Sequence, residues 1–157
     1  MVSEKAVKIV TEFMKVLNNR AADVIKDVGA NAITDVTGFG LLGHLYEIIN
    51  GEEIGARIYC ERVPFFPEVE QLSKMGLVPA GTHNNINARK FAVINDADIE
   101  SYFLDILFDA QTSGGLLFTV PERHSFEVIN KLNSNGVKHT AIIGEIVAEP
   151  KGKILLQ

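Results

Sequence analysis

The sequence predicts one α/β domain, an α+β sandwich in which helices cover a mixed, largely antiparallel sheet. Helical and strand-like segments alternate along all 157 residues, without repeats or low-complexity stretches. Apolar residues make up 46% of the chain, enough for one core but too little length for two domains. A Pro-Lys-Gly turn at 150–152 separates the last two strand candidates, which favours an antiparallel pair there.

Two amphipathic helices are predicted in the first 29 residues. From Glu4 to Asn18, apolar residues recur at spacings of three and four with charged residues between them, and Ser3 is suited to cap this helix. A second helix is predicted from Ala21 to Val28, with Gly29 suited to follow its last turn. We expect both apolar stripes to face the core.

A strand, a glycine-rich turn and a helix are predicted within ANAITDVTGFGLLGHLYE, residues 30–47. The apolar pair Ala32-Ile33 leads into a polar run, and a helical pattern follows from Leu41 to Ile49. The turn contains Gly38, Gly40 and Gly43. Such a junction gathers free backbone N–H groups at the positive end of a helix dipole, which favours anions. Because Asp35 at its entrance would repel a phosphate, the combination indicates a phosphate bridged by a hard cation such as Mg²⁺.

The middle of the chain predicts a strand, a short helix and a loop. Gly55 to Arg62 alternates and contains β-branched residues, as a strand does. Glu68 to Met75 is predicted as a helix ended by Gly76. Leu77 to Asn87 contains a proline, a glycine and the polar run Thr-His-Asn-Asn, so a loop is predicted.

The last third predicts two helices and three strands. In order, these are a helix at Asp98–Phe108, a strand at Leu116–Val120, a helix from Pro121 to Gly136, and strands at Ala141–Val147 and Lys153–Leu156. The helix that begins at Pro121 is expected to turn Phe126, Ile129 and Leu132 inward.

Composition excludes several classes of function. The net charge of −5 arises without long runs of one sign, which argues against a nucleic-acid surface. No apolar run is long enough to span a bilayer, and the N-terminus lacks a signal-peptide pattern. Cys60 is the only cysteine, so the chain has no internal disulfide and no CxxC metal site. We expect a cytoplasmic protein that binds neither nucleic acid nor membrane.

The glycine pattern by itself also fits a dinucleotide-binding fingerprint. Gly38-x-Gly40-x-x-Gly43 follows a strand and opens a helix, and Glu61 lies at about the distance of a ribose-binding acid. The chain would then be a fragment of a dinucleotide-dependent oxidoreductase. Against this, the preceding strand is short and ends in polar residues. A third alternative is a non-catalytic binding module.

Three segments together resemble one enzyme family. ITDVTGFGLLGH at 33–44 and FDAQTSGGLL at 108–117 resemble signatures of selenophosphate synthetase, also called selenide, water dikinase. PAGTHNN at 79–85 resembles the PGGT-type loop of that family. Ala110 stands where the family usually has Pro, and Ala80 where it has Gly. The resemblance covers only the C-terminal half of the enzyme, which is similar to the C-terminal domain of aminoimidazole ribonucleotide synthetase.

The resemblance implies an ATP-dependent phosphotransferase that makes selenophosphate from selenide, ATP and water and releases AMP and phosphate. In that family the N-terminal half carries the reactive Cys or selenocysteine, a catalytic Lys, most ATP contacts and two metal-binding aspartates. Residues 1–157 would then be one C-terminal domain, inactive alone, whose partner is the N-terminal domain of the same enzyme in a homodimer. No catalytic residue is expected within this chain.

The resemblance also implies roles for particular residues. Asp35, which could otherwise be a helix cap or turn residue, is expected to bind Mg²⁺ shared with the N-terminal domain, with ATP as substrate. A phosphate- or substrate-site loop is expected at Thr37, Gly38, Gly40, Asp109, Gln111, Thr112 and Ser113. Asp109 and 111–113 could equally form a plain helix-to-strand connection. Independently of the resemblance, His44 and His83 are expected to serve packing or solvation, and Cys60 is expected to be a small core residue.

Overall fold

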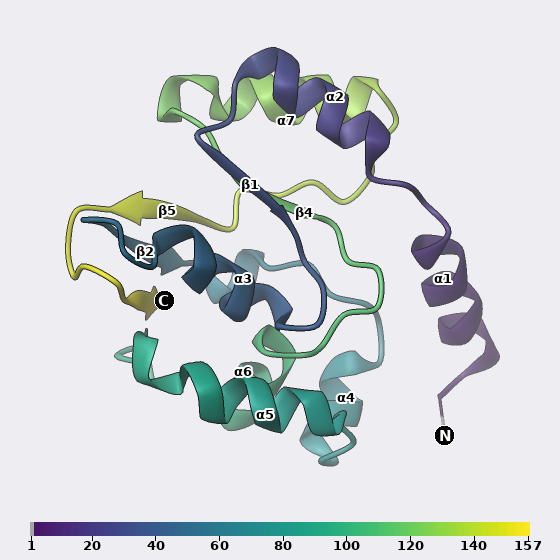
Figure 1. Ribbon diagram of the computed structural model, residues 1–157. Helices are drawn as coiled ribbons and strands as arrows, with labels where there is room; N and C mark the ends of the chain where they lie inside the picture. Colours follow the sequence, from purple (N-terminus) through teal and green to yellow (C-terminus); the bar gives the residue numbers. More distant parts are fainter. Residues whose placement is uncertain (1) are drawn as a thin grey trace.

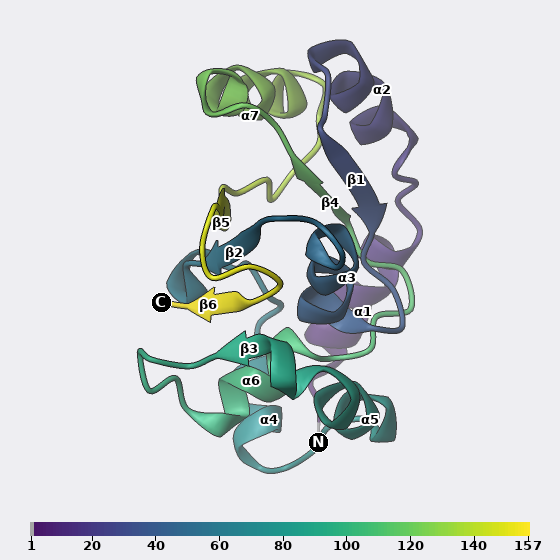
Figure 2. The same ribbon diagram turned by 60° about the vertical axis from the view of Figure 1, so that its left-hand side comes forward.

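The computed structural model describes residues 2–157 and contains two sheets (Figures 1 and 2). The smaller sheet pairs β1 (Ala32–Asp35) with β4 (Leu116–Thr119) in antiparallel orientation. The larger sheet has the order β3-β6-β2-β5. Its strands are β2 (Gly55–Ile58), β3 (Val93–Ile94), β5 (Gly144–Val147) and β6 (Ile154–Leu156).

Helices lie on both sides of these sheets. Their bounds are α1 Glu4–Met14, α2 Asn19–Val28, α3 Gly40–Ile49, α4 Val69–Lys74, α5 Ala80–Arg89, α6 Ser101–Leu107 and α7 Ser125–Ser134. In both views α2 and α7 lie side by side beyond one end of the β1–β4 pair, and α4, α5 and α6 gather at the opposite end of the molecule (Figures 1 and 2). Helix α3 contacts β1, β2, α5 and α6, so the glycine-rich segment before it lies among several elements.

The larger sheet is mixed, as predicted, but the antiparallel pair expected between the last two strands is wrong. Strand β2 lies between β5 and β6, antiparallel to the first and parallel to the second. The turn at 150–152 therefore connects β5 to β6 across the end of β2. There, Gly152 N–H donates to the Ile54 carbonyl at 2.8 Å. A Cβ at Gly55 would lie 2.2 Å from the Pro150 carbonyl oxygen, so the crossing requires glycine at position 55.

The predicted loop at Leu77–Asn87 is also wrong, because Ala80–Arg89 forms α5. Its buried residues are polar: Thr82 is fully buried and Asn85 is 9% exposed. Both side chains form hydrogen bonds with other segments. The inward face of this helix therefore lacks the apolar periodicity by which helices are recognised in sequences.

Other elements are shorter than predicted. The first helix ends at Met14, and the helix expected over Asp98–Phe108 covers only Ser101–Leu107. The strand expected at Gly55–Arg62 ends at Ile58, and Cys60–Arg62 is a 3₁₀ turn. A 3₁₀ turn also precedes α7, whose inward residues are Val128 and Leu132, whereas Phe126 is 76% exposed and does not face inward.

Two apolar clusters form the core. The larger joins α3 to the four-stranded sheet and α6, and includes Leu42, Ile49, Phe108 and Ile154. The smaller lies between α2 and α7. Cys60 is buried in the larger cluster, as predicted. Within residues 2–157, no helix combines the length and apolarity needed to cross a membrane.

Candidate functional site

The β1–β4 pair brings the two glycine-containing motifs together. Asp35 lies opposite Leu116, and the pairing continues past the strand end through Val36 N–H, which donates to the Gly115 carbonyl at 2.9 Å. Gln111 N–H donates to the Thr37 carbonyl at 3.0 Å. Segments 35–40 and 108–115, at least 68 residues apart in the chain, thus form one double-stranded structure that we call the motif pair.

At two glycines of the motif pair, the backbones of the two segments lie too close together for a side chain to fit between them. Gly40 has φ +70°, and a Cβ there would lie 2.6 Å from the Phe108 carbonyl carbon. A Cβ at Gly114 would lie 2.2 Å from the Val36 carbonyl oxygen. Carbon atoms do not approach so closely, so any larger residue would push the two segments apart. Gly40 is buried by this contact, whereas Gly38 is exposed and has nothing within 4 Å of its Cβ position.

Helix α5 holds the motif pair from one side. The Asn85 amide donates to the carbonyls of Gly38 and Phe108, at 2.8 and 3.0 Å, and so joins both segments. The Thr82 hydroxyl donates to Oδ1 of Asp109 at 3.0 Å. All three segments that carry the family resemblance therefore meet. Thr82 and Asn85 were not predicted as site residues, although the resemblance to the PGGT-type loop was a signal for them.

Asp109 is held by neighbouring side chains on both carboxylate oxygens. Thr82 donates to Oδ1, and Gln111 Nε2 donates to Oδ2 at 3.0 Å. Burial raises the pKa of the Asp109 carboxyl, and these hydrogen bonds partly oppose that effect. The arrangement fits a plain connection between α6 and β4, in which neighbouring side chains satisfy the hydrogen-bonding groups of Asp109. Thr112 and Ser113 are exposed, and the Ser113 hydroxyl lies 3.4 Å from the Met14 carbonyl.

Asp35, the expected metal ligand, ends β1 and is exposed. None of the ion pairs formed within residues 2–157 involves it. The same part of the chain contains no group of three His, Cys, Asp or Glu side chains able to hold a metal ion. Asp35 therefore offers a hard cation one accessible carboxylate, and the remaining oxygen ligands would have to come from water, substrate or other protein.

A hydrogen-bonded chain connects Thr37, in the segment after Asp35, with two side chains of α3. Nε2 of His44 is 3.0 Å from the Thr37 hydroxyl, and Nδ1 is 3.0 Å from Oε2 of Glu47. His44 is 6% exposed, so the expectation that it packs inside α3 is correct but incomplete. His83 is exposed on α5.

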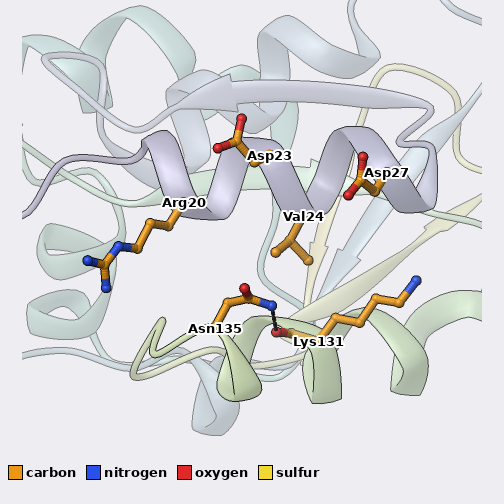
Figure 3. A pocket seen from close by; sticks show the side chains of 6 residues that line it. All are labelled: Arg20, Asp23, Val24, Asp27, Lys131 and Asn135. Atoms are coloured by element: carbon orange, nitrogen blue, oxygen red, sulfur yellow. Dashed lines mark hydrogen bonds between the residues drawn. The ribbon is translucent and has the colours of Figure 1, made fainter.

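Hollows elsewhere on the surface involve other residues. Figure 3 shows one of about 310 Å³ between α2 and α7, lined by Arg20, Asp23, Val24, Asp27, Lys131 and Asn135. In that view Arg20 and Asp23 point away from each other, and Lys131 forms an ion pair with Glu127 outside the hollow. Another, of about 260 Å³, includes Cys60 and Glu61. Burial raises the pKa of the Cys60 thiol, which keeps it protonated and unreactive.

The strand arrangement does not match a dinucleotide-binding fold. That fold needs the strand before the glycines and the next strand in one parallel sheet. Here β1 pairs antiparallel with β4, and β2 belongs to the other sheet. Glu61 lies in a 3₁₀ turn, not at a strand end. The oxidoreductase alternative therefore lacks its structural basis.

Comparison with known proteins identifies the family. The family described as AIR synthase related protein, C-terminal domain, matches residues 2–157. The chain belongs to this family. Among curated relatives, it is 40% identical over 144 residues to a selenide, water dikinase of Pelobacter propionicus, covering 92% of this chain and 41% of that protein. It is also 40% identical over 161 residues to a selenide, water dikinase of Carboxydothermus hydrogenoformans, covering 100% of this chain and 45% of that protein.

The AIR synthase related domain thus spans less than half the length of these relatives. Among solved structures, the hydrogenase maturation protein HypE is similar with a TM-score of 0.58 and 19% identity, covering 91% of this chain and 39% of HypE. This likeness concerns the fold alone. It confirms the expected fold class, and the family match over residues 2–157 confirms the relation to the C-terminal domain of aminoimidazole ribonucleotide synthetase.

Proposed function

We propose that this AIR synthase related domain is the C-terminal domain of a selenide, water dikinase and forms one wall of its ATP site. The enzyme would convert selenide, ATP and water into selenophosphate, AMP and phosphate. The observation that carries the proposal is the convergence of three family-like segments on a face where Asp35 is exposed and free of ion pairs. The 40% identity to proteins of that name supports it.

In this proposal Asp35 supplies one carboxylate to Mg²⁺, and Thr37 and Gly38 border the phosphate side of the site. When bound, Mg²⁺ would neutralise phosphate charge, which phosphoryl transfer requires. The chain's own contribution is rigid placement: Asn85 and the glycine contacts hold the segment that follows Asp35. Asp109 supports that placement through the hydrogen bonds that its two carboxylate oxygens accept from Thr82 and Gln111.

The remaining ligands and the selenide-handling residue would come from the rest of the full-length protein, which is the domain's principal partner. A homodimer of the full-length enzyme and a cytoplasmic location belong to the same proposal. A reducing compartment agrees with Cys60, which is a free, buried thiol.

The test is Asp35→Asn in the full-length protein that carries this domain. The substitution keeps shape but removes the charged ligand, so AMP formation should fall by at least about 100-fold, since even residues behind metal ligands cost about 10- to 100-fold. The fold, followed by circular dichroism, should not change. Asp96→Asn is the matched control, because Asp96 is an exposed aspartate outside all three segments.

Two results would contradict the proposal. One is near-normal AMP formation by the folded Asp35→Asn protein at limiting Mg²⁺. The other is AMP formation by residues 1–157 alone, since one carboxylate cannot hold Mg²⁺ and ATP with useful affinity. A folded full-length protein with no activity toward selenide would instead favour a non-catalytic binding module.

A further inference from the structure

Helix α1 carries apolar side chains that the rest of the domain leaves open. Val7, Val10 and Met14 recur at spacings of three and four and therefore share one side of the helix, and Val16 and Leu17 follow directly after its last turn. We call these five residues the α1 stripe. Four of them are between 41% and 74% exposed, and Val10 is half-buried. The expectation that the first helix turns its apolar stripe to the core is therefore wrong for this side.

The adjoining side of α1 does contact the domain. Ala6 is buried, and the Phe13 ring packs edge-on against Phe66 with centroids 5.0 Å apart and lies 5.4 Å from the His139 ring. A surface helix that packs on one body alone usually carries polar residues outside the packed side. The apolar surface of α1 is thus wider than the part that packs against residues 2–157.

Helix α1 is held in place at both ends. The Ser3 N–H donates to Oε2 of Glu68 at 3.0 Å, and the Ser3 hydroxyl donates to Oε1 of the same carboxylate. Beyond the other end, Nδ2 of Asn18 donates to the Gly114 carbonyl at 3.1 Å. Figure 1 shows α1 at the side of the molecule, beside the connection between α6 and β4. The α1 stripe is therefore presented in a fixed place.

One of these anchors joins the α1 stripe to the candidate site. Gly114, which accepts the hydrogen bond from Asn18, donates its own N–H to the Val36 carbonyl at 3.1 Å. Val36 directly follows Asp35 in the chain. A body that packs on the α1 stripe would therefore lie next to the motif pair, where the proposed site needs its remaining ligands.

We propose that the α1 stripe is the docking surface for the rest of the full-length protein, which contacts it through an apolar surface of its own. This inference rests on the proposed function, because that function places the domain in a longer enzyme. The chain covers only 41% and 45% of two selenide, water dikinases, so more than half the length of each has no counterpart in this domain. Exposed apolar patches on soluble domains commonly mark contacts with other protein surfaces.

A part of the same polypeptide fits this surface better than a second copy of the chain. Stable interfaces between separate proteins use about 20–30 residues on each side, far more than the α1 stripe offers. Covalent linkage instead gives the attached part a high effective concentration, so a small apolar contact is sufficient to hold it.

The first experiment is hydroxyl-radical footprinting of the full-length protein, which measures the oxidation rate of each methionine side chain. Met75, at the end of α4, is the internal control. Met14 is 41% exposed and Met75 63% exposed in the domain. If the α1 stripe is covered, Met14 should be oxidised more slowly than Met75 by a larger factor than these exposures explain. A ratio that the exposures do explain would overturn the inference.

The second experiment repeats the footprinting with Leu17→Glu in the full-length protein. A carboxylate placed in an apolar contact should open it and raise the oxidation rate of Met14. The fold of the domain itself should not change, because Leu17 is 74% exposed. Phe126→Glu is the matched control: Phe126 is 76% exposed on α7, outside the α1 stripe, and its substitution should leave Met14 as slow as in the wild type. Equal Met14 rates in Leu17→Glu and Phe126→Glu would contradict the proposal.

Two further measurements separate the possible outcomes. Sedimentation should give Leu17→Glu and the wild type the same mass; the loss of a subunit would assign the α1 stripe to a second copy and overturn the proposal. AMP formation is measured on the same protein. Sheltered Met14 in a protein that forms no AMP would refute the dikinase assignment but keep this inference, whereas an active enzyme with accessible Met14 would do the reverse.

Discussion

Replacing Gly40 by alanine should destabilise the domain strongly, because two penalties coincide at that position. The backbone has φ +70°, a conformation that residues with a Cβ rarely adopt. The new Cβ would also lie 2.6 to 2.8 Å from backbone atoms of Phe108 and Asp109. Since those atoms belong to the backbone of the motif pair, no side chain can turn away to make room.

The structure contains controls for each penalty. Gly51 has φ +84° but nothing within 4 Å of its Cβ position, so Gly51→Ala measures backbone strain alone. Gly38 has neither a positive φ nor a close neighbour, so Gly38→Ala should change stability by less than about 1 kcal/mol. Strain costs about 1–2 kcal/mol and overpacking about 1–3 kcal/mol. Gly40→Ala should therefore lose about 2–5 kcal/mol.

Urea unfolding of residues 1–157, followed by circular dichroism, measures these differences. With a slope of about 1–3 kcal/mol per molar urea, Gly40→Ala should lower the unfolding midpoint by about 1–3 M. Gly51→Ala should lower it less, because only the strain of about 1–2 kcal/mol applies there. If Gly40→Ala and Gly51→Ala were equally stable, the contact between Gly40 and the 108–109 backbone would be refuted.

Two further predictions concern the side chains that hold the motif pair. Asn85→Ala removes the donor from the half-buried Gly38 carbonyl and from the buried Phe108 carbonyl and should cost about 2–4 kcal/mol of unfolding free energy in the same assay, whereas His83→Ala on the exposed face of α5 should cost less than about 0.5 kcal/mol. Because burial raises the folded-state pKa of Asp109, this group contributes stability that is present at low pH and is lost as pH rises through that pKa. Thr82→Val removes a hydrogen bond that lowers the same pKa, so carboxyl ¹³C NMR should show Asp109 titrating at a still higher pH.

Local patterns in the sequence were sufficient to predict those helices and strands whose apolar residues recur with a regular period. The second helix, β1, α3 and α7 lie close to their predicted positions, and Gly29 and Gly76 follow helices as expected. The three family-like segments also indicated the family before any contact was known. The place of Asp35 at the entrance of the glycine-rich turn, together with the family resemblance, predicts a metal ligand, and the structure leaves its carboxylate accessible. Its metal role remains a prediction.

Contacts between distant segments decided the rest. Helix α5 was missed because Thr82 and Asn85 face inward, and a polar residue is stable there only when a partner from another segment satisfies it. The order of β5, β2 and β6 was missed because a short turn normally joins adjacent strands. The role of Gly40 depends on the backbone of Phe108, 68 residues later in the chain. A sequence pattern reports spacing along one segment, whereas hydrogen bonding and close packing depend on distances that exist only once the chain has folded.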